Sequence, residues 1–216
     1  TFHTILRNAK RRKAIGFVKA ITTMLNSKQT KQRRNNMETE YALGLDIETT
    51  GLEDDALILE VALVLFNSKF EEEKSISKTI YHPIEEIHNS MGEYVTNMHT
   101  ENGLLDEIKT LNPNQTLALV EEELCDWIDE NTSGTPLPMF GSSIHYDRTL
   151  VSLQMPKLYS KFHYRSIDAT SIKLAAQGLS TKEIEPFEPR GTTHRGHDDL
   201  LNSAAVVKHY FELYKG

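Results

Sequence analysis

Apolar residues recur with two different periods along the chain, and each period predicts a different kind of element. Residues 57–66 (LILEVALVLF) are almost wholly apolar, which is typical of a strand buried on both faces. Residues 75–82 alternate between apolar and polar side chains, and residues 41–48 are largely apolar with alternation at their end, so both segments predict strands. Two shorter strands are predicted at residues 136–140 and 162–167.

Helical spacing dominates the second half of the chain. Apolar residues three or four positions apart predict one helix that begins near the Asn112-Pro113 pair and continues through Ile128. Further helices are predicted at residues 170–177 and along the apolar stripe of residues 200–214. Strands that come first and helices that are interleaved later predict an α/β fold, in which helices flank a mixed sheet.

Charge divides the sequence into two parts. Residues 1–36 contain ten Lys and Arg residues and no Asp or Glu, whereas the remaining 180 residues carry 14 basic and 31 acidic residues. Apolar side chains at helical spacing between Ile15 and Leu25 predict a basic amphipathic helix, which a polar tether over residues 26–36 follows. We therefore expect a basic N-terminal helical arm at residues 1–36 and one globular domain at residues 37–216.

The basic arm admits several interpretations. It can contact nucleic-acid phosphates, lie on an anionic surface, dock on another protein or on the acidic domain, act as a targeting segment, or remain a solvated extension. No stretch approaches ~18 consecutive apolar residues, so no membrane span is expected. The single cysteine, Cys125, excludes an internal disulfide framework and fits a reducing compartment. We expect a cytoplasmic location, with organellar targeting by the basic N-terminus left open.

Two carboxylates stand at the end of the first predicted strand. Side chains alternate across a strand, so Asp46 and Glu48 point to one face and Ile47 points to the other. Two carboxylates on one face cannot both stay charged at low cost without a cation, and Mg²⁺ and Mn²⁺ prefer oxygen ligands. The pair therefore indicates a divalent metal site, and the alternative is two solvated acids.

Two later motifs carry related chemistry. In the segment GSSIHYD a Gly/Ser turn follows a predicted strand, so Asp147 lies near a helix start and Ser143 can offer a hydroxyl or an amide to a phosphate. In the segment HRGHDD His194 precedes Asp199 by five positions, with a glycine between them that permits close approach. Taken singly, the first segment is also compatible with an ordinary helix cap, and the second with a charged first turn of a helix.

Together the three motifs resemble the DEDDh family of 3′→5′ exonucleases, whose pattern is Asp-x-Glu, then Asp, then His followed five positions later by Asp. All of these residues appear here in the family's order. The resemblance narrows to oligoribonucleases through the segments DIETTGL, GSSIHYDR and HRGHDD, and it covers roughly residues 41–214. It implies an RNase H-like fold with a five-stranded mixed sheet, and it leaves residues 1–36 unexplained.

The resemblance also implies a catalytic centre. Two divalent cations, Mg²⁺ or Mn²⁺, would be bound by four carboxylates from the three motifs: Asp46, Glu48, Asp147 and Asp199. Four negative charges and two divalent cations would balance, which leaves a site that can accept an anionic phosphodiester. His194 would be the general base, because counting back from Asp199 by the family spacing reaches it, whereas His197 falls where the family varies.

Substrate-side residues follow from the same resemblance. Leu52 occupies the position of a leucine that wedges between bases, and Tyr94 stands where the family usually has tryptophan, five residues before His99, which matches a family histidine. Tyrosine can replace tryptophan because stacking tolerates both, although it would hold a base less tightly. Three residues would cap a 5′ phosphate, the last two from a partner subunit, which implies a homodimer: Ser143, Tyr164 and Arg165.

The sequence thus predicts a metal-dependent 3′→5′ exoribonuclease that degrades very short single-stranded RNA, dinucleotides preferred, to nucleoside 5′-monophosphates. One alternative is a broader DEDDh exonuclease that acts on single-stranded DNA or longer RNA. Another, from a different class, is a binding protein that acts through its basic arm, with catalysis secondary or lost. The intact acidic motifs weigh against the loss of catalysis.

Overall fold

The computed structural model describes residues 41–179 and 193–214, together with residues 186, 187, 189 and 191 between them. The helical arm and tether predicted at residues 1–36, and the domain boundary at residue 37, lie outside the described residues. No helix in the described part of the chain is long and apolar enough to cross a membrane.

A five-stranded mixed sheet forms the centre of the fold, as the sequence predicts. Its strands are β1 (Tyr41–Thr49), β2 (Ile58–Asn67), β3 (Glu72–Thr79), β4 (Leu137–Gly141) and β5 (Phe162–Asp168). They lie in the order β3-β2-β1-β4-β5, with β2 antiparallel to both β1 and β3. Because β4 and β5 run parallel to β1, the ends of β1 and β4 that lead into the acidic motifs lie at the same edge of the sheet.

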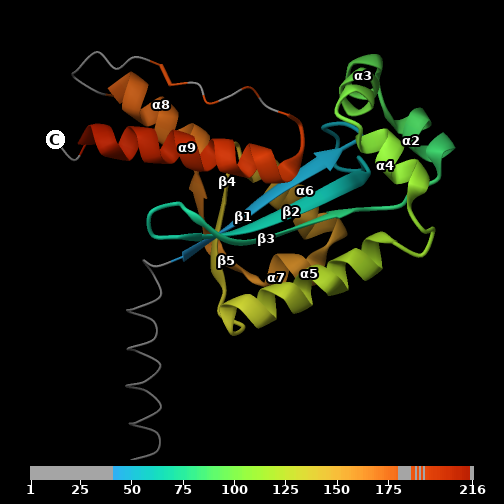
Figure 1. Ribbon diagram of the computed structural model, residues 1–216, viewed down its shortest axis with the longest axis horizontal. Coiled ribbons are helices and arrows are strands. Elements are labelled where there is room, and N and C mark those ends of the chain that lie inside the picture. The colour runs from blue at the N-terminus through green and yellow to red at the C-terminus, as the bar shows by residue number, and fades with distance from the viewer. Residues whose placement is uncertain (1–40, 180–185, 188, 190, 192, 215–216) are drawn as a thin grey trace, which may run out of the picture. The chain divides into compact units, whose positions relative to one another are not determined.

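Helices cover both faces of this sheet (Figure 1). Three short helices, α2 (Ile84–Ser90), α3 (Glu93–Glu101) and α4 (Leu104–Thr110), follow β3. The next three, α5 (Leu117–Thr132), α6 (His145–Gln154) and α7 (Pro156–Ser160), pack on one face of the sheet. The last two, α8 (Ala169–Leu179) and α9 (Gly196–Tyr214), pack on the other face.

The alternating side chains of β1 and β2 supply two separate hydrophobic cores. Leu43 on β1 packs with α5, α6 and α7, whereas Phe66 on the opposite face of β2 packs with α9. Both faces of β2 are therefore buried, which explains its continuous apolar run. A Cβ on Gly44 would lie 2.9 Å from Phe66 and 3.1 Å from Leu200, so glycine at this position lets α9 lie directly on β1.

Two predicted boundaries are wrong. The long helix α5 begins at Leu117 rather than near residue 112, because the Thr116 side chain is its N-cap and accepts a hydrogen bond from an amide in the first turn. The third strand covers Glu72–Thr79 rather than residues 75–82. The short helices α2, α3 and α4 are absent from the expectations based on sequence. Of these, α2 and α4 bury apolar side chains in a third, smaller core that includes Leu59 at the start of β2.

Candidate active site

Two of the three acidic motifs meet at the end of β1. Asp46 and Glu48 lie on the face of β1 that α9 covers, while Ile47 packs into the opposite core. Asp147 lies in the first turn of α6, and its Oδ1 accepts a hydrogen bond of 3.1 Å from the Ile47 amide. This bond fixes the second motif against the strand that carries the first.

The third motif reaches the same place because Gly196 has no side chain. A Cβ there would lie 2.7 Å from a β2 side chain and 3.3 Å from Asp46 Oδ2, so a larger residue would push the start of α9 off the sheet. Asp199 follows three residues later and lines the same cavity as Asp46. Glu48, His194 and Asp199 each bring one potential ligand atom within 4.8 Å of the other two.

Asp46, Glu48 and Asp147 resist ionisation, chiefly because they are shielded from water. Burial raises the pKa of Glu48 to about 8 and that of Asp147 to about 7. The pKa of Asp46 lies well above its usual range, first because of burial and then because of the neighbouring carboxylates. Carboxylate oxygens are the donors that hard divalent cations such as Mg²⁺ and Mn²⁺ prefer. The residues therefore fit a divalent metal centre, whose cations would supply the missing positive charge.

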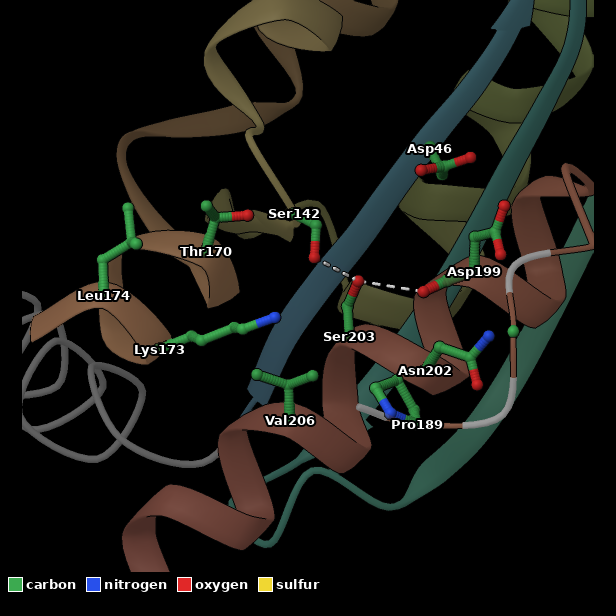
Figure 2. A pocket seen from close by; sticks show the side chains of 11 residues that line it. Asp46, Ser142, Thr170, Lys173, Leu174, Pro189, Asp199, Asn202, Ser203 and Val206 are labelled. Atoms are coloured by element: carbon green, nitrogen blue, oxygen red, sulfur yellow. Dashed lines mark hydrogen bonds between the residues drawn. The ribbon is translucent and has the colours of Figure 1, made fainter. Parts of the chain in front are cut away.

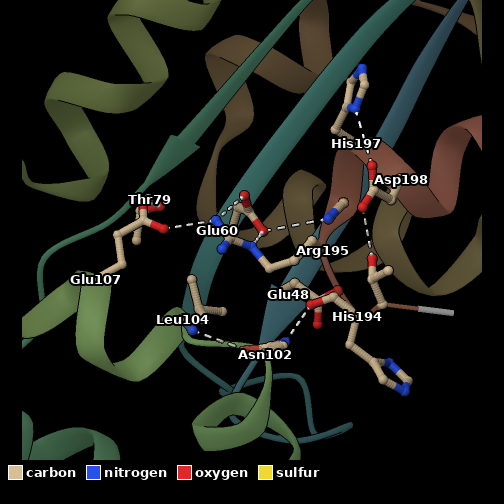
Figure 3. A network of polar contacts seen from close by, with 12 residues as sticks. Glu48, Glu60, Thr79, Asn102, Leu104, Glu107, His194, Arg195, His197 and Asp198 are labelled. Carbon is tan, nitrogen blue, oxygen red and sulfur yellow. Dashed lines mark hydrogen bonds and ion pairs between the residues drawn. The ribbon is translucent and has the colours of Figure 1, made fainter.

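Arg195 lies close to this cluster but binds other carboxylates (Figure 3). Its Nε and Nη2 atoms each lie 3.0 Å from an oxygen of Glu60, and Nη2 also lies 2.8 Å from Glu107. The Glu60 side chain is only 3% exposed, so the pair is buried on the glutamate side. Arg195 lowers the pKa of Glu48, but burial and the surrounding carboxylates together outweigh it. Its charge therefore does not neutralise the site.

The two histidines of the third motif lie in different places. His194 has a φ of 51°, and its carbonyl oxygen accepts a hydrogen bond of 2.6 Å from Asn102 Nδ2. His197 instead points to β3, where its Nε2 lies 3.2 Å from both carboxylate oxygens of Glu72. The structure thus brings His194, rather than His197, beside the clustered carboxylates.

The three side chains expected to contact a base differ in exposure. Leu52 and Tyr94 are 80% and 75% exposed, which is high for large apolar side chains, and Tyr94 lines a cavity of about 440 Å³ together with His194. His99 has no exposed surface, and its Nε2 donates a hydrogen bond of 3.0 Å to the Thr49 carbonyl. Burial also lowers the pKa of its ring. His99 therefore holds the end of β1 and has no surface with which to touch a substrate.

A cavity of about 480 Å³ extends from Asp46 and Asp199 to α8 (Figure 2). Thr170 and Lys173 of α8 line its opposite wall, and the Lys173 side chain extends into it. Ser143 stands beside this wall, because its amide donates a hydrogen bond of 3.1 Å to Thr170 Oγ1. Hydroxyl groups and an amine therefore face the carboxylates across the cavity.

The other two residues expected at a 5′ phosphate lie on the edge strand β5. The Arg165 guanidinium lies over the ring of Tyr164, 5.2 Å from its centroid, and Tyr164 is exposed. Neither is among the described residues that line the cavity with Asp46 and Asp199.

Some residues that shape the site are missing from the sequence-based prediction. Tyr146 donates a hydrogen bond of 2.6 Å to the Gly51 carbonyl and so holds the loop that carries Leu52. Tyr146 lies inside the segment GSSIHYD, and Arg195, which binds Glu60 and Glu107, lies inside HRGHDD. Their location within these motifs could have indicated a role at the site. Asn102, which binds the His194 carbonyl, lies outside the three acidic motifs.

Comparisons with known proteins agree with this geometry. A model of the RNase T exonuclease family matches residues 43–207. An oligoribonuclease of Neisseria meningitidis serogroup B is 33% identical over 171 residues, which cover 79% of this chain and 90% of that protein. An oligoribonuclease of Pseudomonas aeruginosa PAO1 is 31% identical over 173 residues, which cover 77% of this chain and 91% of that protein.

A solved structure shares the fold. The crystal structure of cell-death related nuclease 4 (CRN-4) superposes with a TM-score of 0.58 at 17% sequence identity. The match covers 82% of this chain and 65% of the nuclease chain, so this chain spans slightly less than two thirds of that protein. At this identity the likeness concerns the fold alone, and it confirms the predicted RNase H-like fold with its mixed five-stranded sheet.

Proposed function

Because the chain belongs to the RNase T exonuclease family of DEDDh 3′→5′ phosphodiester hydrolases, we propose that it degrades very short RNA, dinucleotides preferred, to nucleoside 5′-monophosphates. The observation that carries the proposal is the cavity between the carboxylates and α8. Asp46 and Asp199 stand at one end of it, and Thr170 and Lys173 line the other. A 5′ phosphate bound by the Thr170 hydroxyl and the Lys173 amine would limit the substrate to the few nucleotides that fit between this wall and the carboxylates.

The same proposal assigns the metal ligands. Two divalent cations, Mg²⁺ or Mn²⁺, would be held by the residues whose carboxylates gather at the end of β1: Asp46, Glu48, Asp147 and Asp199. The burial that raises the pKa of Glu48 and of Asp147 supports this assignment, because buried carboxylates need a cation nearby to stay charged. When bound, such cations lower the pKa of a water and stabilise the attacking and leaving oxygens of an in-line displacement.

His194 acts as the general base in this scheme. A bond forms between the water oxygen and phosphorus, and the bond from phosphorus to the upstream 3′ oxygen breaks. One proton of the attacking water passes to a ring nitrogen of His194, and the leaving 3′ oxygen takes up a proton from solvent water. The closeness of a ring nitrogen to the Glu48 and Asp199 carboxylates supports this role, because the reacting water must lie near the same ligands.

Leu52 and Tyr94 bind the 3′-terminal nucleotide. Leu52 wedges beside the base and Tyr94 stacks on it, and the high exposure of both side chains supports these roles. His99 contributes through the backbone, since its ring holds the Thr49 carbonyl at the end of the strand that carries Asp46.

The proposal includes a homodimer. Tyr164 and Arg165 lie on β5, which is an edge strand of the sheet, and neither is among the described residues that line the cavity with Asp46 and Asp199. In a dimer these residues would reach the 5′ phosphate in the neighbouring site. Dissociation of the dimer would then lower activity on dinucleotides.

A length series tests the substrate class. We would measure kcat/KM with Mg²⁺ for 5′-phosphorylated RNA of two, three, five and ten nucleotides, and for the matching DNA. Asp147→Asn, which keeps the size of the side chain but removes its charge, serves as the control for contaminating nucleases. The proposal predicts the highest kcat/KM for the RNA dinucleotide.

Two outcomes would contradict the substrate assignment. Equal kcat/KM for the RNA dinucleotide and the ten-nucleotide RNA would favour a broader exonuclease on longer RNA, and a preference for DNA would favour a DNA exonuclease. A protein that binds these oligonucleotides without hydrolysing any of them would favour the binding-protein alternative.

A further inference from the structure

We propose that Asn102 is a positioning residue for His194, an inference that rests on the proposed role of His194 as general base. His194 has a φ of 51°, a left-handed conformation that a residue with a side chain rarely adopts unless its surroundings hold it. The contact that holds it on one side is the hydrogen bond of 2.6 Å from Asn102 Nδ2 to the His194 carbonyl (Figure 3).

The Asn102 amide has only one orientation that satisfies its neighbours. Its Oδ1 accepts a hydrogen bond of 3.0 Å from the Leu104 amide, so Nδ2 must face His194. The same Nδ2 lies 3.5 Å from His99 Nδ1. Because the Thr49 carbonyl can only accept, His99 Nε2 carries the ring proton and Nδ1 is left as an acceptor toward Asn102. A flipped amide would place oxygen against oxygen at the His194 carbonyl.

Asn102 is itself rigidly placed. It lies at the C-cap of α3, where its backbone amide donates a hydrogen bond to the Met98 carbonyl, and its side chain bonds the first residue of α4. The donor that meets His194 is therefore fixed by two helices rather than by a loose loop.

The residue after His194 is held from the opposite side. Arg195 binds Glu60 and Glu107, and the Gly196 amide lies 3.4 Å from Glu60 Oε2. The peptide that carries the His194 side chain is thus held between Asn102 and the Arg195 ion pairs. Without the Asn102 donor, the His194 backbone can relax toward ordinary φ values, and its ring would leave the carboxylates.

Asn102→Asp is the most informative variant. It keeps the size of the side chain and the acceptor for the Leu104 amide, and it replaces the donor that faces the His194 carbonyl with an oxygen. Thr100→Asp is the matched control, because it adds the same charge at an exposed position of the same helix without touching this bond. Asn102→Ala serves as the second variant in case the aspartate variant does not fold.

The readout is epistasis with His194, measured as kcat on an RNA dinucleotide at saturating Mg²⁺. Since small displacements of a catalytic group cost up to about 10²-fold, Asn102→Asp should lower kcat by about 10–100-fold with KM changed less than about threefold. In the His194→Ala background the same substitution should change kcat by less than about threefold, because the base is no longer there to be positioned.

Three results would overturn the positioning role. In the first, Asn102→Asp and Asn102→Ala retain the kcat of the Thr100→Asp control. In the second, they lower kcat by the same factor in the wild-type and His194→Ala backgrounds, as a general structural defect would. If His194→Ala alone retains near-normal kcat, the general-base assignment fails and the positioning role fails with it. Loss of activity in His194→Ala combined with normal activity in Asn102→Asp removes only the positioning role.

Discussion

Arg195→Met should destabilise the protein, because it leaves Glu60 buried without its cation. Three hydrogen bonds of 2.8–3.0 Å join the guanidinium to Glu60 and Glu107. Breaking a fully buried ion pair from one side costs about 3–5 kcal/mol, and the 30% exposure of the Arg195 side chain reduces this to roughly 2–4 kcal/mol. In a domain of this size, that loss lowers Tm by roughly 5–15 °C.

The assay is urea unfolding of the metal-free protein, kept in EDTA so that cation binding does not mask the effect. The fluorescence of Trp127, which packs against the core, reports the transition. Lys109→Met is the matched control, because Lys109 forms a pair of 2.7 Å with Asp106 in which both side chains are exposed, and such pairs contribute less than about 1 kcal/mol. The combined Arg195→Met and Glu60→Gln variant should regain much of the lost stability, since the charge of Glu60 is then removed together with its partner.

The Arg195–Glu60 pair would not stabilise the fold if the free energy of unfolding of Arg195→Met lay within about 0.5 kcal/mol of that of Lys109→Met. The pairing would also be contradicted if Glu60→Gln added its full cost to that of Arg195→Met, since two residues that act as a pair should not be additive.

Three further predictions concern the site and the arm. In EDTA, Tm should fall as pH rises from about 5 to 8. In the folded protein Glu48 and Asp147, with pKa values of about 8 and about 7, retain protons that the unfolded chain has released. Mg²⁺ should therefore raise Tm more at pH 8 than at pH 6, and an equal rise at both pH values would contradict this. His194→Asn should lower kcat by about 10²–10⁴-fold while His197→Asn does much less, and the reverse order would show that the third motif is misassigned. Deleting residues 1–36 should leave kcat/KM on a dinucleotide within about threefold, or ~0.7 kcal/mol, because a dinucleotide offers the basic arm too few phosphates to bind. A larger loss would mean that the arm shapes the site.

Local patterns predicted the elements that are buried in a regular way. β2 was predictable because both of its faces are covered, which makes its sequence apolar almost without interruption. The alternation at the end of β1 placed Asp46 and Glu48 on one face, and Ile47 does pack into the opposite core.

The errors have local causes as well. Asn112-Pro113 begins a turn rather than a helix, because Asn112 Oδ1 accepts a hydrogen bond from the Asn114 amide and its carbonyl accepts one from Gln115. The helix signal lies instead at Thr116, the N-cap. The helices α2, α3 and α4 are too short to show a full apolar stripe, and α2 and α4 pack in a small core that includes Leu59 of β2.

The supports of the site depend on contacts between residues far apart in sequence. Asn102 meets the His194 carbonyl across 92 positions, and Glu60 meets Arg195 across 135 positions, so neither contact has a local pattern. Glu60 did offer one signal, because a glutamate inside a nearly apolar strand requires a buried cation as its partner. That signal indicates a buried ion pair without identifying Arg195.

The most direct test of the account is the identity of the product and the origin of its oxygen. RNA dinucleotide is hydrolysed with Mg²⁺ in water enriched in ¹⁸O, and the products are analysed by mass spectrometry, with parallel reactions in EDTA and with Asp147→Asn. A carboxylate-bound metal centre that directs water to the phosphodiester predicts that the nucleoside 5′-monophosphate released from the 3′ end carries one ¹⁸O atom, and that both control reactions are inactive. Products that end in a 3′ phosphate or a 2′,3′-cyclic phosphate, or hydrolysis that persists in EDTA or with Asp147→Asn, would contradict the account.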